Sequence, residues 1–134
     1  MGALAQRSQT MKLLTKEIER KLPPLYSQEK NVDPTIQVKF FHCMSPMTWF
    51  AWEYSPERRE FFGLITGGNT DELGYFSLDE LEETRVHGLK MERDMYFDPQ
   101  PLSKVNPKIY AMLKQAEEER KHQTPEVICL GSSV

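Results

Sequence analysis

The sequence of 134 residues has little cysteine and no long apolar run. Only Cys43 and Cys129 are present, and no two Cys or His residues have the short spacing of a structural zinc site. No hydrophobic stretch approaches the roughly 20 residues that a membrane-spanning helix needs. We therefore expect no disulfide, no metal, no cofactor and no membrane association.

An excess of basic residues is also absent, since the net charge is −3. Lys and Arg outnumber Asp and Glu by nine to seven over residues 1–66, but thirteen acidic residues face eight basic ones over residues 67–134. Broad, sequence-independent DNA binding draws its affinity from clustered Lys and Arg. The composition argues against that function, although it leaves room for a local basic patch.

The domain organisation follows from length and composition. Hydrophobic residues make up 39% and charged residues 28%, as is typical of globular proteins. The first residues lack the apolar stretch of a secretory signal, so we expect a cytoplasmic protein. We predict a flexible extension over residues 1–10, a single α+β domain over residues 11–122 and a C-terminal tail over residues 123–134.

The centre of the chain is an aromatic stretch from Ile36 to Thr66, which holds both tryptophans and five of the seven phenylalanines. Strand-like alternation and the turn signals around Pro56 predict a three-stranded antiparallel meander, in which residues 36–42 and 48–54 are neighbours. A fourth strand is expected over residues 73–76. Residues 91–97 alternate in the same way and predict one more strand at the edge of the sheet.

Two helices are predicted at the ends of the domain. Leucine and isoleucine recur at helical spacing over residues 14–22, where Thr15 is the expected N-cap and two prolines end the helix. Asn106 followed by Pro107 is typical of a helix start, and the apolar stripe after it predicts a longer helix that reaches about His122.

The most reliable local signal is the pair Ser77 and Glu80, which has the spacing of a capping box. It predicts a two-turn helix that His87 and Gly88 close. Together these elements predict an α+β fold, in which an antiparallel β-meander of about four to five strands is packed by two to three helices.

Several segments resemble a small bacterial family that is known only as a domain of unknown function. The resemblance rests on MKLLTKEIERKLPPLYSQE, VKFF, TWFAWEYSPERREFFGLITG, ELGYFSLDELEETR and ERDMYFDPQPLS, and it spans roughly residues 11–104. Members of that family are generally encoded on plasmids, integrative conjugative elements and other mobile DNA. The resemblance thus implies an accessory role in that setting, and it implies no activity and no ligand set.

A catalytic site is the weakest of three functional hypotheses. Glu53 with Glu60, or Asp71 with Glu72, would supply the general acid and base of a small hydrolase. Carboxylates on a sheet surface are more often solvated or paired with basic residues. The segment GLITGGNTDELG lacks the Lys and Ser or Thr of a phosphate-binding loop, so a hairpin turn explains it better. The sequence therefore does not establish whether the protein is an enzyme, and it is more readily explained without catalysis.

Two binding hypotheses remain. The first is a non-catalytic protein-interaction module that binds a basic partner, encoded by the same mobile element or by the host, through clustered acidic residues. Its candidate residues are Asp71, Glu72, Asp79, Glu82 and Glu83. The alternative is a DNA-associated accessory protein that stacks single-stranded nucleic acid on an aromatic and basic face of the sheet. Its candidate residues are Lys39, Trp49, Trp52, Tyr54, Arg58 and Arg59. A core between two layers of helices would instead bury these aromatic side chains.

Overall fold

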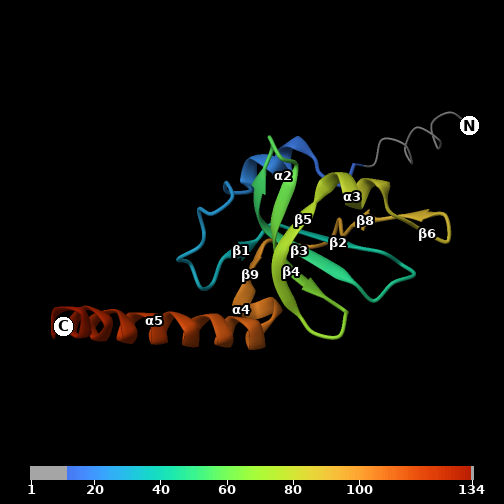
Figure 1. The fold of residues 1–134 in the computed structure, drawn as a ribbon. Coiled ribbons are helices and arrows are strands. Elements are labelled where there is room, and N and C mark those ends of the chain that lie inside the picture. The colour runs from blue at the N-terminus through green and yellow to red at the C-terminus, as the bar shows by residue number, and fades with distance from the viewer. Residues whose placement is uncertain (1–11, 134) are drawn as a thin grey trace, which may run out of the picture.

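The computed structural model describes the backbone of residues 12–133 and the side chains of residues 12–121. At its centre is a five-stranded antiparallel sheet in the order β5-β4-β3-β2-β8 (Figure 1). Its strands are β2 (Val38–Phe41), β3 (Thr48–Ser55), β4 (Glu60–Thr66), β5 (Glu72–Ser77) and β8 (Glu92–Arg93). The predicted α+β class is confirmed, and so is the predicted pairing of the first two long strands, which places Val38 opposite Ala51.

The edge strand β8 is shorter than predicted. Residues 91–97 were expected to form one strand, but the chain turns directly after Arg93. The N–H of Asp94 still donates to the carbonyl of Lys39 at 2.9 Å, while the Asp94 side chain accepts from the N–H of Tyr96 at 2.9 Å. This local side-chain turn ends the strand and leaves the Tyr96 side chain exposed.

Two small ladders accompany the main sheet. Strand β1 (Thr35–Ile36) pairs with β9 (Gln100–Pro101), and β6 (Arg85–Val86) pairs with β7 (Leu89–Lys90). His87 and Gly88 connect β6 to β7 and have φ angles of 54° and 77°. Both angles suit the two-residue turn of a tight hairpin. The expectation that His87 and Gly88 close the preceding helix is therefore wrong, because that helix ends at Glu83 and has Thr84 as its C-cap.

The helix starts follow their capping signals. Helix α2 (Lys16–Lys21) is capped by Thr15, whose hydroxyl accepts from the N–H of Ile18 at 3.2 Å. Helix α3 (Leu78–Glu83) is capped by Ser77, whose hydroxyl accepts from the N–H of Glu80 at 3.2 Å. The reciprocal bond of the capping box, from the Ser77 N–H to the Glu80 carboxylate, is not formed in the described chain. Both predicted N-caps are confirmed.

The C-terminal helices differ from the prediction in extent. A short helix α4 (Leu102–Val105) was not predicted, and it precedes α5 (Pro107–Ser133). Asn106 caps α5 as expected, because its side-chain oxygen accepts from the N–H of Ile109 at 3.1 Å. The helix continues past His122, so its backbone includes most of the predicted tail. In Figure 1 the later turns of α5 extend well beyond the sheet.

The sheet has a hydrophobic core on each face. One core contains residues that flank or belong to α2 and α3, and the other contains residues of α4 and α5. Figure 1 shows these two helix pairs on opposite sides of the sheet. The first core comprises Leu13, Leu14, Leu22, Val38, Phe40, Ala51, Tyr54, Phe61, Phe76, Leu78, Leu81 and Met91. The second comprises Ile36, Trp52, Leu64, Leu102 and Ile109, with Phe50, Phe62, Leu73 and others packed against it.

The predicted flexible extension over residues 1–10 lies outside the described residues. Over the part of the chain that is described, none of the helices is both long and apolar enough to cross a membrane.

Candidate functional site

A β-bulge in β3 creates the most distinctive site of the molecule. The register between β3 and β4 shifts between Ala51 and Glu53, so that Trp52 is the extra residue. Strict alternation would place Glu53 on the same face as Ala51. Because of the bulge, Glu53 follows Trp52 onto the α5 face and pairs with Phe62, while Tyr54 returns to the first core.

Glu53 is 3% exposed, and its carboxylate holds the loop that follows α2. One oxygen accepts from the N–H of Tyr26 at 2.9 Å, and the other accepts from the N–H of Gln28 at 2.7 Å. Tyr26 has a φ of 70°, a left-handed conformation that residues other than glycine seldom adopt. The buried carboxylate therefore fixes a strained loop against the sheet.

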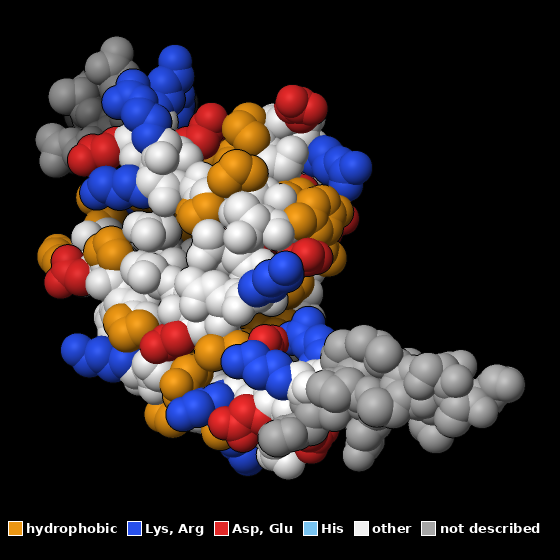
Figure 2. Space-filling model, turned by 90° about the vertical axis from the view of Figure 1, so that its left-hand side faces the viewer, with side chains coloured by type: hydrophobic (Ala, Val, Ile, Leu, Met, Phe, Trp, Pro, Cys, Tyr) orange, Lys and Arg blue, Asp and Glu red, His pale blue; other side chains and the backbone are white. Residues whose placement is uncertain are grey.

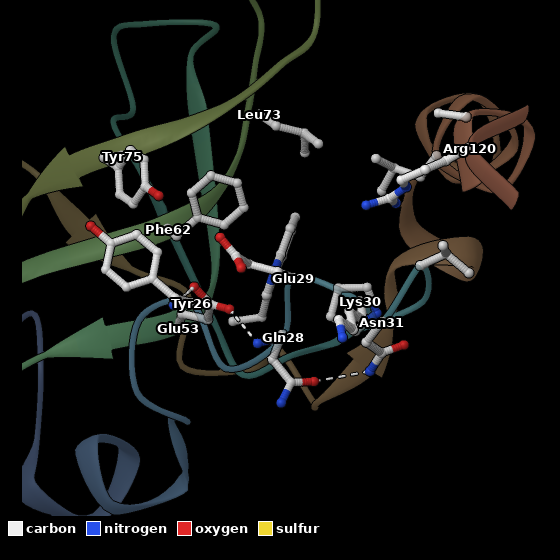
Figure 3. Close-up of a pocket in the computed structure, with 15 residues that line it drawn as sticks. Tyr26, Gln28, Glu29, Lys30, Asn31, Glu53, Phe62, Leu73, Tyr75 and Arg120 are labelled. Carbon is white, nitrogen blue, oxygen red and sulfur yellow. Dashed lines mark hydrogen bonds between the residues drawn. The ribbon is translucent and has the colours of Figure 1, made fainter. Parts of the chain in front are cut away.

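This loop, the sheet and α5 line an open cleft, which has a volume of about 430 Å³. Figure 3 shows Phe62 and Tyr75 on the strands that form its floor, the loop with Tyr26 and Gln28 along one side, and Arg120 reaching in from α5. Its lining combines aromatic, aliphatic and charged side chains. They belong to Tyr26, Gln28, Glu29, Lys30, Asn31, Val32, Pro34, Trp52, Glu53, Phe62, Leu73, Tyr75, Leu113, Ala116 and Arg120.

Two half-exposed tyrosines stand at the rim of the cleft. The rings of Tyr26 and Tyr75 are 6.1 Å apart, and Phe62 lies 4.8 Å from Tyr75 on the sheet side. In Figure 3 the two rings lie next to one another, with their hydroxyl groups on opposite sides of the pair. Burial raises the pKa of the Tyr75 hydroxyl above 10.0, and the neighbouring Tyr26 raises it further. Tyr75 thus remains a neutral hydrogen-bond donor at physiological pH.

The charged groups of the cleft balance one another. Glu29 and Glu53 supply two carboxylates, and Lys30 and Arg120 supply two cations. Arg120 also forms an ion pair with Glu117 on its own helix. The lining is therefore an aromatic surface with a mixed polar rim, in which neither charge dominates.

Several carboxylates of the predicted acidic surface form hydrogen bonds or ion pairs with other residues of the protein. Arg59, on the β3–β4 turn, donates to Asp79 at 2.6 Å and to Glu82 at 2.8 Å, and the hydrogen bond to Asp79 raises the pKa of its guanidinium. Asp71 accepts from the side-chain amide of Asn106 at 2.9 Å. Of the five candidate carboxylates, Glu72 and Glu83 are exposed and are not engaged in this way within the described chain.

The predicted aromatic and basic face is not a single exposed surface. Trp52 and Tyr54 are each 3% exposed and belong to opposite cores, while Trp49 packs against the first core. Lys39 pairs with Asp94 at 3.5 Å and lies 5.8 Å from the centre of the Phe50 ring. Arg58 is exposed. The structure therefore does not bring these six candidates together, and two of them are enclosed by the fold.

The distribution of charge on the surface also argues against an exposed nucleic-acid-binding face. On the face shown in Figure 2, basic side chains stand among acidic and hydrophobic ones, without a continuous basic band. A track of neighbouring cations is what phosphate backbones bind most strongly. This face offers no such track.

His42 is a second buried titratable side chain, with 2% exposure. Its Nε2 atom lies 2.9 Å from the carbonyl oxygen of Leu89, and its Nδ1 atom accepts from the N–H of Met44 at 2.9 Å. The ring joins the end of β2 to the β6–β7 hairpin. Among the described residues, no group of three or more His, Cys, Asp or Glu side chains could hold a metal ion.

Sequence reasoning considered Glu53 as a catalytic partner of Glu60 and missed its actual neighbours. The structure engages both Glu53 oxygens with backbone amides, and it does not place the pair Asp71 and Glu72 in the cleft lining. One signal was available, since a single carboxylate inside the run WFAWEY is unusual for a buried strand. Tyr26 and Gln28 carry no comparable signal, because only the fold brings them to Glu53.

The fold and the cleft define a small α+β domain with both sheet faces covered and an aromatic-lined cleft beside a long helix. The chain belongs to the family described as "Protein of unknown function (DUF2958)", which it matches over residues 4–123. The match is longer than the predicted span of residues 11–104 and includes residues 107–123 of α5. No curated protein and no solved structure matches the chain.

Proposed function

We propose that the protein is a non-catalytic interaction module, which binds another protein through the cleft between the sheet, the Tyr26 loop and α5. The observation that carries this proposal is the pair of half-exposed tyrosines at the rim of an aromatic cleft. Tyrosine is enriched in protein interfaces because it offers a large contact area and a hydroxyl while few rotatable bonds have to be ordered. The Glu53 carboxylate holds the backbone of Tyr26, and Tyr75 is part of strand β5, so a partner would meet a preorganised surface.

The two buried titratable groups support a role without catalysis. A general base must be able to reach a substrate proton. Both oxygens of Glu53 accept hydrogen bonds from backbone amides. Both ring nitrogens of His42 are within hydrogen-bond distance of backbone groups. These groups stabilise loops in the present fold, which weakens the hydrolase hypothesis.

The sequence resemblance supports a biological setting for this module. Members of the family it resembles are generally encoded on plasmids and integrative conjugative elements. We therefore expect a bacterial accessory protein of such elements, acting in the cytoplasm, with a partner encoded by the element or by the host. Single-stranded DNA remains the alternative ligand, and the burial of Trp52 and Tyr54 weakens it.

A matched pair of helix substitutions tests the proposal. Ala116 and Ala111 are both exposed on α5, but only Ala116 lines the cleft. Ala116→Trp should fill the cleft, while Ala111→Trp adds the same side chain elsewhere. The full chain is used to capture proteins from cells that carry the parent element, and each captured protein is purified and titrated by calorimetry. We expect Ala116→Trp to weaken binding at least tenfold and Ala111→Trp to leave it unchanged.

Two results would count against the proposal. One is that every captured protein binds both tryptophan variants equally well. The other is tight binding of a single-stranded oligonucleotide at physiological salt that Arg58→Ala with Arg59→Ala removes. The second result would favour the DNA alternative.

A further inference from the structure

The floor of the cleft ends at an open edge of the sheet. Strand β5 is terminal in the order β5-β4-β3-β2-β8, and it pairs with β4 alone among the described strands. Edge strands present unpaired N–H and C=O groups to the surroundings. A cleft that continues into such an edge can bind backbone as well as side chains.

The register identifies which residues present these groups. The N–H of Leu78 donates to the carbonyl of Arg59 at 2.9 Å, immediately beyond the pair Ser77 and Glu60. In an antiparallel ladder the hydrogen-bonded pairs alternate, so the backbone groups of Phe76 and Gly74 point to β4. The backbone groups of the residues between them, Tyr75 and Leu73, therefore point outward.

The same two residues line the cleft with their side chains. Leu73 and Tyr75 thus offer an outward backbone and a cleft-facing side chain at once. On the other face of the strand, a Cβ atom added to Gly74 would meet no atom within 4 Å. Both faces of the β5 edge therefore have room beside them for the side chains of an added strand.

Strand β5 and the helix that follows it are acidic. From Asp71 to Glu83, β5 and α3 carry six carboxylates and neither Lys nor Arg. Arg59 neutralises part of this charge through Asp79 and Glu82. Glu72 at the start of β5 and Glu83 at the end of α3 remain exposed. A basic peptide would be attracted to Glu72 at the start of β5 and to α3, which follows the end of the strand.

We propose that an extended, basic peptide segment of the partner adds to β5 as a further strand and places an apolar side chain in the cleft. This inference rests on the proposed function and names the class of ligand. An extended peptide repeats its donors and acceptors every second residue, about 7 Å apart, which is the spacing that Leu73 and Tyr75 present. Apolar residues at alternate positions would face Tyr75, Phe62 and Leu113, and the remaining positions would carry Lys or Arg.

The test begins with a display library of short linear peptides selected on the full chain. We expect enrichment of peptides that alternate apolar and basic residues, and no enrichment of these peptides on Ala116→Trp. The best peptide is then synthesised in two N-methylated forms, one methylated at the odd positions and one at the even positions. Because only alternate amides would face β5, one form should bind at least tenfold more weakly and the other within about twofold of the parent.

Substitution of the strand provides the complementary measurement. Tyr75→Pro removes an outward N–H, and proline is tolerated on edge strands where the N–H faces solvent. Tyr75→Ala removes the same ring and keeps that N–H. We expect Tyr75→Pro to bind the selected peptide at least fivefold more weakly than Tyr75→Ala, with matched circular dichroism spectra. If Tyr75→Pro fails to fold, the two N-methylated peptides still decide the question.

The outcomes separate the two proposals. Equal binding of both N-methylated forms, or enrichment of acidic peptides, would overturn strand addition while a cleft-dependent protein partner still supported the interaction module. Absence of any peptide whose binding depends on Ala116 would also overturn strand addition. The proposed interaction module would itself be contradicted by the capture experiment if Ala116→Trp left the affinity for every captured protein unchanged.

Discussion

Gly63 of β4 and Gly74 of β5 are direct partners in the antiparallel ladder, yet their surroundings are opposite. A Cβ atom added to Gly63 would lie 1.7 Å from the carbonyl oxygen of Phe50, whereas one added to Gly74 would meet nothing within 4 Å. The close approach at Gly63 lies beside the bulge that positions Glu53. The two glycines therefore serve different purposes in the same pair of strands.

Alanine at these two positions should have opposite effects. Gly63→Ala is expected to lower the free energy of unfolding by about 3 kcal/mol, because two strand backbones must separate. Gly74→Ala should change it by less than about 1 kcal/mol, and it can stabilise the protein by restricting the unfolded chain. Urea denaturation of both variants measures the difference. Equal effects would show that the close contact at Gly63 does not limit the packing of β3 and β4.

The anchor of the Tyr26 loop leads to a second prediction. Glu53→Ala should lower the free energy of unfolding by about 3 kcal/mol, because two buried backbone amides lose a charged acceptor. The exposed Glu29 lies in the same loop and provides the control, since Glu29→Ala should cost less than about 0.5 kcal/mol. Chemical denaturation monitored by tryptophan fluorescence is a suitable measurement. A small effect of Glu53→Ala would mean that the amides find other acceptors.

The observed half of the capping box gives a third prediction. Ser77→Ala should destabilise the protein by about 1 kcal/mol, because the N–H of Glu80 loses its acceptor. Glu80→Gln should cost less than about 0.5 kcal/mol, since the reciprocal bond is not formed. Thermal melts of the two variants compare the contribution of the Ser77 hydroxyl with that of the Glu80 carboxylate. Comparable losses would indicate that the Glu80 carboxylate does engage the Ser77 amide in solution.

A fourth prediction concerns high pH. Burial raises the pKa of Tyr54 above 10.0, so the folded protein keeps the Tyr54 proton at pH values where the unfolded chain has released it. The folded state then binds more protons, and its stability is full below about pH 10 and falls as the pH rises above that value. Tyr54→Phe should remove part of this fall. Urea unfolding of both proteins at about pH 8 and at about pH 11 tests the difference.

The fifth prediction concerns the exposed acidic residues that would attract a basic partner. Glu72→Lys combined with Glu83→Lys should slow association with a basic partner and weaken its dependence on salt, because exposed rim charges act mainly on the on-rate. The matched control is Glu57→Lys with Glu118→Lys, which makes the same change in net charge at exposed sites outside β5 and α3. Stopped-flow measurements over a range of salt concentrations compare the two. Equal slowing by both pairs would point to net charge rather than to this surface.

Local signals in the sequence predicted much of the fold. Thr15, Ser77 and Asn106 act over three residues along the chain, so their capping roles are independent of tertiary context. The aromatic strands were recognisable for a similar reason, since alternation reflects the local geometry of an extended chain. His87 and Gly88 show the limit of such signals, because the same pair can end a helix or form a hairpin turn.

The site depended on features that local patterns do not record. The extra residue Trp52 reverses the facing of Glu53, and period-two reasoning cannot locate a bulge without the partner strand. The Glu53 carboxylate meets the amides of residues that lie 27 and 25 positions earlier in the chain. The burial of Trp52 and Tyr54 was equally hidden, since it required knowing that helices cover both faces of the sheet.

The Glu53 anchor also makes two amide hydrogens into reporters of local opening. Tyr26 and Gln28 lie in a loop, where exchange with solvent deuterium is usually fast. Their amide hydrogens are held by a buried carboxylate and can exchange only when the loop leaves the sheet. Slow exchange at these two positions, between faster neighbours, would therefore measure how often the wall of the cleft detaches. A ligand that closes the cleft would slow both amides together, even if it touched neither residue.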